Sequence, residues 1–459
     1  MLNAADLEEV LAAPQRRTEV ASVELTEALL GRIESLNPQL SAFIAVTPDA
    51  ALADAHRVDA ARRRGEALPL DGLALGIKDN IDVTGVATTV GSPLFREAIA
   101  GSDAECVARL RAAGAVILGK TLLHEITFGV SCDNPWYGTG RNPWDADRIP
   151  GGSSGGSGAA VAADMCMGAL GTDTGGSVRI PAALNGVTGL RPTLGSISTA
   201  GTFPLSWSLD TIGPLARSVD DVAALFGVMA GYDPADPRSL RPPARVEPSP
   251  ESNDIRGLRI GVPRDFFFDD LDPAFEDSLD GAVFTLRELG ADVRDLRLPG
   301  LWREAETACA HILLAEAYAV HGERFRAHPE SFGGDVAQRL TRGADITGSE
   351  LAALYQVGFE WRRALEGLFG DVDLILTPAT SSTAPLINGI DTLETSRRFG
   401  AITGPWAIGG VPALAVPCGF ADGLPVGMQL VAPRWREDLL FRTGRTFQSV
   451  TTWHRMRPR

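Results

Sequence analysis

The sequence contains two glycine- and serine-rich stretches on which its interpretation depends: Pro150-Gly151-Gly152-Ser153-Ser154-Gly155-Gly156-Ser157-Gly158 and Gly171-Thr172-Asp173-Thr174-Gly175-Gly176-Ser177-Val178-Arg179. Glycine has no Cβ, so a glycine-rich backbone can turn sharply and aim its N–H groups at a ligand. A serine in such a turn is a candidate nucleophile, and the N–H groups beside it are a candidate oxyanion hole. The two stretches therefore predict an enzyme.

The segments on either side of these stretches alternate between helical and extended patterns. Helices are expected over 22–36, with Ser22 as N-cap and Asn37-Pro38 as the stop, over 49–64 and over 103–113. Short apolar strands are expected over 70–78, ending at Lys78, and over 115–120. This alternation favours an α/β fold with helices on both faces of a sheet.

Further along the chain the pattern changes several times. The small residues 157–170 indicate one tightly packed helix, in which Ser154 and Ser157 are expected to serve as caps. The proline-rich segment 231–253 is expected to be an exposed connector. A strand over 257–263, helices between 272 and 368, and a hairpin-like pair of strands at 413–417 and 428–431 are predicted beyond it.

Composition and charge exclude several classes of protein. The net charge is −16, and no basic run is longer than Arg62-Arg63-Arg64, so neither a nucleic acid nor an anionic membrane is an expected partner. The five cysteines form no C-x-x-C pair, and no metal or cofactor is expected. The amino terminus lacks the features of a signal peptide, so we expect a cytoplasmic location.

Three further classes of protein fit the same motifs less well. The first stretch is similar to a phosphate-binding loop, but it lacks the Gly-Lys-Ser/Thr ending, and no G-x-G-x-x-G follows a predicted strand. His124-Glu125 is not followed by the second histidine of a zinc-protease motif. Neither Ser153 nor Ser177 lies in the G-x-S-x-G sequence of a Ser-His-Asp hydrolase.

Taken together, Lys78 and the two stretches resemble the signature region of the amidase signature family of serine hydrolases. Ser177 follows Ser153 by 24 positions, as in that family, and Gly189-Leu190-Arg191-Pro192-Thr193 and Ser208-Leu209-Asp210-Thr211-Ile212-Gly213-Pro214 also agree. The resemblance implies a single α/β/α sandwich over residues 1–459, with a large twisted mixed sheet flanked by helices. Within it we expect a signature core at about 70–230, the connector 231–253 and a helical substrate-pocket region at about 264–370.

The resemblance also implies a Ser–cis-Ser–Lys triad. Ser177 would be the nucleophile, Ser153 the bridging serine after a cis peptide at Gly152–Ser153, and Lys78 the general base. Lysine serves as a base near neutral pH only if burial lowers its ordinary pKa of ~10.4 by roughly 2–3 units. The oxyanion hole would use the backbone N–H groups of Thr174, Gly175, Gly176 and Ser177, with support from Ser154, Thr172, Asp173 and Arg179.

The expected substrate is a small, largely uncharged amide, aryl amide or carbamate, hydrolysed by a monomer or homodimer. By position, Thr127, Gly129, Val130 and Ser131 are expected on the acyl side, and Trp207 and Trp406 are candidates for the cleft wall. The alternative is the A subunit of a glutamine-dependent amidotransferase, which supplies ammonia to a partner. Residues 308–317 depart from the tyrosine- and serine-rich stretch expected of such a protein, which favours a free-standing amidase.

Overall fold

A computed structural model describes residues 4–12, 14–243, 254–269 and 271–458. In this part of the chain eleven strands form one mixed sheet in the order β1-β3-β2-β6-β8-β7-β12-β13-β11-β9-β10. The strands of the sheet are β1 Phe43–Val46, β2 Ala74–Lys78, β3 Val116–Thr121, β6 Gly168–Asp173, β7 Thr188–Arg191, β8 Thr211–Ala216, β9 Arg259–Val262, β10 Asp292–Asp295, β11 Leu374–Pro378, β12 Ala413–Ala421 and β13 Leu424–Val431. A separate ribbon pairs β4 Asp133–Asn134 with β5 Gly138–Thr139.

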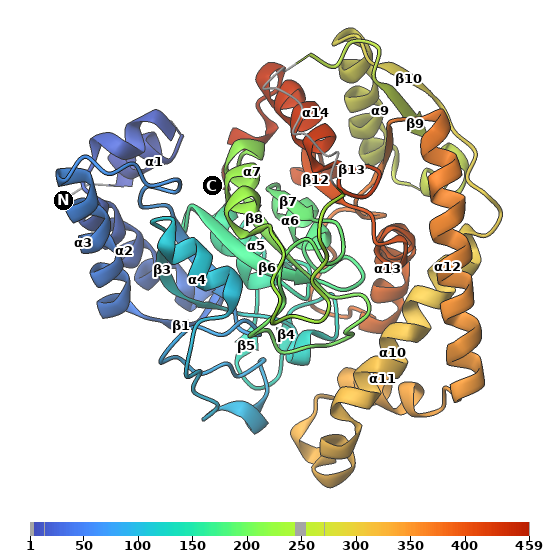
Figure 1. The fold of residues 1–459 in the computed structure, drawn as a ribbon, viewed down its shortest axis with the longest axis horizontal. Helices are drawn as coiled ribbons and strands as arrows, with labels where there is room; N and C mark the ends of the chain where they lie inside the picture. The colour runs from blue at the N-terminus through green and yellow to red at the C-terminus, as the bar shows by residue number, and fades with distance from the viewer. Residues whose placement is uncertain (1–3, 13, 244–253, 270, 459) are drawn as a thin grey trace.

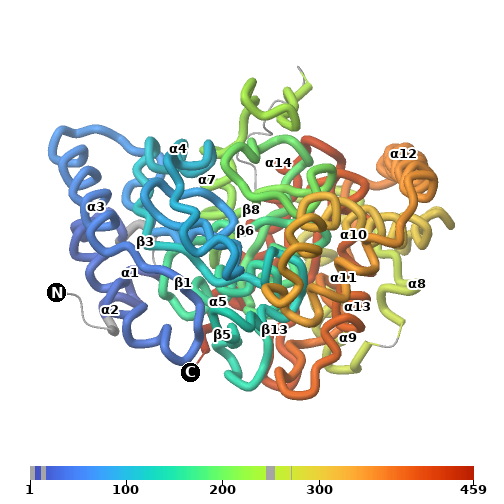
Figure 2. The backbone as a smooth tube through the Cα atoms, turned by 90° about the horizontal axis from the view of Figure 1, so that it is seen from below, coloured from blue at the N-terminus to red at the C-terminus, as the bar shows by residue number. Residues whose placement is uncertain are grey.

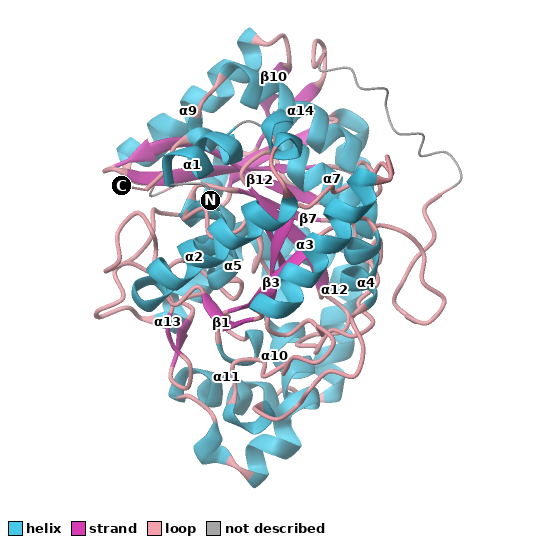
Figure 3. Cartoon of the chain, turned by 90° about the vertical axis from the view of Figure 1, so that its left-hand side faces the viewer, coloured by secondary structure: helices cyan, strands magenta, loops and turns pink. Residues whose placement is uncertain are grey.

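Helices cover both faces of this sheet, so the expected α/β sandwich with a mixed sheet is confirmed. Figure 3 shows α4 and α7 on one side of the strands and α5 on the other. The helices are α1 Ala4–Ala12, α2 Ser22–Leu40, α3 Pro48–Arg63, α4 Glu105–Ala112, α5 Gly155–Ala162, α6 Arg179–Asn185, α7 Val219–Met229, α8 Arg264–Phe267, α9 Pro273–Glu288, α10 Trp302–Ala327, α11 Gly334–Ala344, α12 Gly348–Asp371, α13 Thr392–Gly409 and α14 Glu437–Val450. None of them, within the residues that the structure describes, is long and apolar enough to cross a membrane.

The two ends of the sheet carry different helices. The amino-terminal helices α1–α3 lie at one end of the molecule, and α12 lies at the other with α10, α11 and α13 towards its side (Figures 1 and 2). Helix α10 packs against α11, α12 and α13, so these four helices form one cluster beside the sheet. The strands between the two ends carry the glycine- and serine-rich loops.

Parallel pairing brings two of the sequence motifs to the same edge of the sheet. Strand β2 pairs in parallel with both β3 and β6. The carboxyl ends of β2 and β6 therefore lie side by side, and these ends carry Lys78 and Asp173. Loops at this edge of a parallel sheet are a frequent location of active sites.

The segment predicted as one helix over 157–170 is instead a short helix followed by a strand. Helix α5 ends at Ala162, Asp164 adopts a left-handed φ of 54°, and β6 begins at Gly168. The residues are small because the helix packs closely on the sheet: a Cβ at Gly156 would lie 2.4 Å from Ala42 O. Small residues of this kind satisfy a buried helix and a buried strand equally, so composition alone did not locate the boundary.

Serines expected to cap helices bind elsewhere. Ser154 stands at the N-cap of α5 but makes no side-chain cap; its hydroxyl donates to Thr172 O (3.2 Å) and accepts from Thr172 N–H (3.3 Å). Ser157 donates to Leu170 O at 2.8 Å. Both hydroxyls therefore fasten α5 to β6. The N-cap of α2 is Ala21 rather than Ser22, whose N–H donates to the Asp59 carboxylate at 2.8 Å.

Helix α2 also runs past its predicted stop. Pro38 lies inside its last turn, and the helix ends at Leu40 because Ser41 adopts the left-handed conformation, with φ 48° and ψ 42°. In the predicted connector, residues 244–253 lie outside the described part, whereas Asp233 and Asp236 are buried and accept hydrogen bonds from Ser198 and Thr199. The beginning of that segment is therefore anchored to the loop between β7 and β8 rather than exposed throughout.

Candidate active site

Lys78 lies at the end of β2 and is fully buried. Its Nζ donates to Ser153 Oγ at 2.7 Å and to Thr172 Oγ1 at 2.8 Å, with Thr172 O at 3.4 Å. None of its hydrogen-bonding partners in the described chain carries a charge. The ammonium form is therefore poorly stabilised here, because burial removes water and no anion within hydrogen-bonding distance replaces it.

Burial lowers the pKa of Lys78 from 10.5 to about 7, although the charges of Asp210 and Asp173 act in the opposite direction. A lysine with this pKa is partly neutral near pH 7 and can accept a proton. The group from which it can accept is the hydroxyl of Ser153, the nearest of its partners. The pair has the geometry of a base and a proton donor.

Ser153 belongs to the loop between Pro150 and α5. The Gly152–Ser153 peptide is cis, and Ser153 is 1% exposed. Its carbonyl accepts from His124 N–H at 3.1 Å, and the next residue, Ser154, donates its N–H to Ser177 O at 3.2 Å. The two serine-bearing loops are therefore joined through their backbones.

Ser177 follows β6 in the loop that leads to α6, and it lines a cavity. Its hydroxyl makes no hydrogen bond within the described residues. In the same part of the chain, the N–H groups of Thr174, Gly175 and Ser177 also make none. The N–H of Gly176, in contrast, donates to Asp173 Oδ1 at 2.8 Å. Of the four expected oxyanion donors, three are available, and that of Gly176 is already engaged.

Asp173 is the carboxylate that fixes this loop. It is fully buried and accepts from Arg179 (Nε–Oδ2, 2.9 Å) and Arg191 (Nη1–Oδ1, 3.0 Å), both also buried. Burial opposes ionisation of Asp173, but the two guanidinium groups outweigh it and hold the pKa of this carboxyl well below its ordinary value. Asp173 also binds the N–H groups of Gly176 and Val178, so an ionised carboxylate shapes the turn that presents Ser177.

Gly176 is required at this turn on two counts. Its φ is 140°, which residues with a side chain rarely adopt. A Cβ there would lie 2.3 Å from Thr403 Oγ1, whose hydroxyl donates to Gly175 O and Phe399 O. Helix α13 thus approaches the loop closely and holds it through the hydroxyl of Thr403.

The cavity beside Ser177 has a volume of about 390 Å³. Three of the residues expected on the acyl side line it together with Phe128 and Ile180: Thr127, Gly129 and Val130. Ser131 is buried behind the wall, within 3.2 Å of His124 Nδ1. Trp207 is 42% exposed and Trp406 is fully buried against Trp361, so neither lines the cavity.

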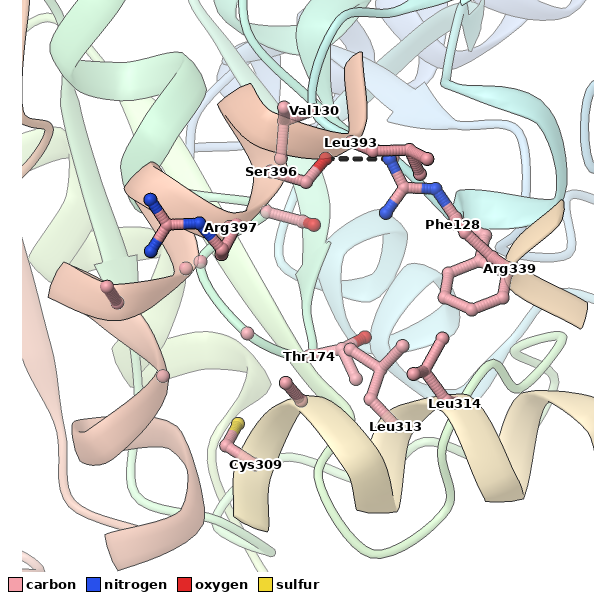
Figure 4. Close-up of a pocket in the computed structure, with 18 of the residues that line it drawn as sticks. Phe128, Val130, Thr174, Cys309, Leu313, Leu314, Arg339, Leu393, Ser396 and Arg397 are labelled. Atoms are coloured by element: carbon pink, nitrogen blue, oxygen red, sulfur yellow. Dashed lines mark hydrogen bonds between the residues drawn. The ribbon is translucent and has the colours of Figure 1, made fainter. Parts of the chain in front are cut away.

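The opposite wall comes from helices that carry no motif. Cys309, Leu313 and Leu314 project from α10 towards the cavity, and Arg339 projects from α11 and donates to Ser396 Oγ of α13 at 2.7 Å (Figure 4). The charged members of this wall are Glu306, Arg339, Arg342, Asp391, Glu394 and Arg397. Glu306, Arg339 and Arg342 lie in the region 264–370 that was expected to form the substrate pocket. Sequence analysis nevertheless singled out none of the six residues, because helix packing decides which side chains face the cavity.

The charges on this wall include a guanidinium and a carboxyl group that are partly removed from water. Arg339 is 8% exposed, and its Nε has no hydrogen-bond partner in the described chain. Burial raises the pKa of Glu306, against the opposing charges of Arg397 and Arg303. No group of histidine, cysteine, aspartate and glutamate side chains in the described residues is arranged to hold a metal ion.

Comparison with known proteins places this site in a family. A family model described as Amidase matches residues 24–441. The A subunit of glutamyl-tRNA(Gln) amidotransferase from Chloroflexus aggregans is 42% identical, over 96% of this chain and 95% of that protein. The solved structure of the protein of the same name from Thermotoga maritima has a TM-score of 0.82 at 30% identity, covering 98% of this chain and 96% of the other.

A second solved structure is more similar in shape. It is described as "An unexpected vestigial protein complex reveals the evolutionary origins of an s-triazine catabolic enzyme", with a TM-score of 0.88 at 35% identity and 98% coverage of both chains. The chain belongs to the amidase signature family and is an amidase-family enzyme.

The comparisons overturn the main functional expectation drawn from the sequence. Relatives about 40% identical along nearly the whole chain are amidotransferase A subunits, not hydrolases of small uncharged amides or carbamates. The expectation rested on the departure at residues 308–317, a single segment of α10.

Proposed function

We propose that this chain is the A subunit of a glutamine-dependent amidotransferase: it hydrolyses the side-chain amide of glutamine and supplies the ammonia to a partner protein. The observation that carries this proposal is the 42% identity to such a protein over 96% of the chain. The cavity supports it, because one wall bears Ser177 with free N–H groups and the other bears charges of both signs.

Catalysis begins with proton transfer towards the buried lysine. Neutral Lys78 accepts the proton of Ser153, Ser153 accepts that of Ser177, and Ser177 Oγ bonds to the amide carbon. The carbonyl oxygen becomes an oxyanion, which accepts from the N–H groups of Thr174, Gly175 and Ser177. These groups are preorganised, since Asp173, Arg179 and Arg191 fix the loop before substrate arrives.

Collapse of this intermediate releases ammonia. The proton held by Lys78 returns through Ser153 to the amide nitrogen, the C–N bond breaks, and the γ-glutamyl group remains as an ester on Ser177. A water molecule, deprotonated by the same relay, then hydrolyses the ester and restores the serine. Every proton is accounted for by the pair Lys78–Ser153, so no metal or cofactor is needed for the chemistry we propose.

Recognition of glutamine uses the charged wall. Arg339, together with Arg342, offers guanidinium groups to the α-carboxylate, and Glu306 offers a carboxylate to the α-ammonium. Charge-assisted hydrogen bonds in a partly desolvated cavity are about twice as strong as neutral ones. Asparagine is one methylene shorter, so we expect it to pair less well with the charged wall while its amide lies at Ser177.

Two experiments test the proposal. Labelling with a fluorophosphonate followed by peptide mapping is expected to modify Ser177; modification elsewhere contradicts the nucleophile assignment. Ammonia release from L-glutamine and L-asparagine is then measured for the chain alone and with the other subunits of a relative's amidotransferase, with Lys78→Ala as the control for contaminating glutaminase.

We expect glutamine to be the preferred substrate and Arg339→Gln to raise its KM at least tenfold. Arg363→Gln, an exposed arginine of α12, is the matched control and should leave KM within twofold. Absence of glutamine hydrolysis both alone and with the partner proteins would reject the amidotransferase assignment while leaving the Ser177 chemistry open to test by labelling.

A further inference from the structure

A buried carboxyl group on α10, outside the cavity, connects the substrate wall to the oxyanion loop. Glu316 is 1% exposed and accepts three hydrogen bonds: from Ser206 Oγ at 2.5 Å, from Ser208 N–H at 3.1 Å and from the hydroxyl of Tyr355. Tyr355 belongs to α12, and the two serines belong to the loop before β8. Glu316 therefore joins α10, α12 and this loop at one point.

Asp210, in the same loop, binds Thr174, the first residue of the oxyanion turn. Asp210 accepts the N–H groups of Leu205 and Ser206 on Oδ2, at 2.9 and 3.0 Å, and the hydroxyl of Thr174 on Oδ1 at 2.6 Å. Burial raises the pKa of Asp210, and these three hydrogen bonds oppose the effect. Thr174 carries one of the N–H groups that remain free beside Ser177. An unbroken series of hydrogen bonds thus runs from Tyr355 through Glu316, Ser206 and Asp210 to Thr174.

We infer that Glu316 is a positioning residue for the oxyanion loop, acting through Ser206 and Asp210 on Thr174; this rests on the proposed role of Ser177 and its neighbouring N–H groups. Because Glu316 lies on α10, this positioning role also connects the oxyanion loop to the cavity wall. Leu313 and Leu314, one turn before Glu316 on the same helix, line the cavity. A substrate that seats against α10 therefore meets a wall that is rigidly linked to the donors on the other side.

The alternative is that Glu316 only stabilises the core. The two roles differ in what they do to Lys78. A loosened core admits water to Lys78, which raises its pKa towards 10.5 and moves the pH profile upwards. Loss of positioning alone admits no water to Lys78. It can only weaken the effect of Asp210, whose charge raises the pKa of Lys78, so any shift of the pH profile is downwards. An upward shift of the midpoint therefore separates the structural role from the positioning role.

The test measures the second-order rate of Ser177 labelling by a fluorophosphonate, which needs the oxyanion donors but not the natural substrate. Glu316→Gln keeps the shape of the side chain but offers one carbonyl where two oxygens accept three donors. We expect it to lower the labelling rate at least tenfold, and Tyr355→Phe, which removes a single hydrogen bond, to lower it about threefold. Glu360→Gln, an exposed glutamate of α12 bonded to Gln356, is the matched control and should stay within twofold of the parent chain.

A double-variant cycle makes the test specific. Thr174→Val breaks the other end of the series, so Glu316→Gln combined with it should label no more than about twofold more slowly than the slower single variant. The midpoint of the pH profile should not rise above that of the parent chain. Independent, multiplicative losses or an upward shift of the midpoint would overturn the positioning role in favour of a structural one.

Two further outcomes are informative. Labelling of folded Glu316→Gln at the parental rate overturns the positioning role alone. Failure of the parent chain to label at Ser177 overturns the nucleophile assignment, and the positioning role with it. If Glu316→Gln does not fold, Tyr355→Phe and Ser206→Ala decide the question by the same criteria, because each leaves the carboxylate with its remaining donors.

Discussion

Two lysines lie near the carboxyl ends of neighbouring parallel strands of the sheet, and their surroundings differ. The chain has only these two, Lys78 on β2 and Lys120 on β3, and both are fully buried. Lys120 forms an ion pair with Asp79 at 2.9 Å and donates to Thr88 Oγ1 at 3.1 Å. Lys78, one strand away, meets two hydroxyls and a carbonyl.

The difference shows how one sheet can hold both an ion-paired lysine and a lysine whose hydrogen-bonding partners are all neutral. A carboxylate within 4 Å favours the charged form of a lysine, whereas burial without such a partner favours the neutral form. Asp79 immediately follows Lys78 in sequence, yet its carboxylate turns to Lys120. The environment of each amine, rather than the residue type or the strand position, determines which lysine is available as a base.

Removing the amine of Lys78 should have the largest effect on activity. Lys78→Met is expected to lower kcat at least a thousandfold at pH 7.5, because Lys78 is the base that hydrogen-bonds to the Ser153 hydroxyl in the described chain. The variant should nevertheless fold. Between pH 7 and 10.5 Lys78 is protonated in the unfolded chain but largely neutral in the folded chain. Burying Lys78 therefore destabilises the folded chain most below pH 7, and this destabilisation disappears above pH 10.5.

Lys78→Met should consequently be more stable than the parent chain at neutral pH, by ~2–5 kcal/mol in the free energy of unfolding. Urea denaturation and ammonia release measure the two effects separately. Turnover within tenfold of the parent chain would reject the assignment of Lys78 as the base.

Lys120→Met should reverse this pattern. Breaking one side of a buried ion pair strands the carboxylate of Asp79 and costs about 3–5 kcal/mol of stability. Turnover per folded molecule should fall less than tenfold, since Lys120 does not contact either serine. The double variant Asp79→Asn/Lys120→Met should recover part of the lost stability. A variant that is fully stable but as inactive as Lys78→Met would mean that Lys120, too, takes part in the chemistry.

These two lysines also show what the sequence could and could not predict. Both follow an apolar strand and a glycine, so the local pattern 115–120 is much like 70–78, and only the serine motifs single out Lys78. The strands were predictable from local periodicity, whereas the mixed sheet followed only from the resemblance to the amidase signature family. The region 264–370, which was expected to form the substrate pocket, contains Glu306 and Arg339, but which of its side chains face the cavity depends on how α10 and α11 pack.

Two other features could not be predicted for a related reason: the boundary between α5 and β6, and the role of Arg191. Small residues between 155 and 173 fit both a helix and a strand, so only the register with β2 and β8 decides where one ends. Arg191 was part of a motif, but the motif did not show that it meets Asp173. Side-chain partners far apart in sequence need the fold before they can be named.

The pH dependence should show Lys78 titrating alone. Because its neutral form is the base and its pKa is about 7, kcat/KM should fall tenfold per pH unit well below 7 and level off above it. With ¹⁵N-labelled lysine the folded protein has only two side-chain amines, so NMR should resolve one that titrates near pH 7, and Lys78→Met should remove that signal. A pH profile of kcat/KM that does not follow this titration would contradict the assignment of Lys78 as the base.

The smallest effect tests how finely the hydroxyls set this pKa. Thr172→Val removes one acceptor from Nζ of Lys78 while keeping the shape of the side chain. Since that acceptor favours the ammonium form, its loss should lower the midpoint of the pH profile, by about 0.5–1 unit for a hydrogen bond worth about 1 kcal/mol. Thr172→Ser keeps the hydroxyl and should restore the parental midpoint. An upward shift of the midpoint in Thr172→Val would mean instead that water takes the place of the hydroxyl. Packing around β6, more than the Thr172 hydroxyl, would then set the pKa of Lys78.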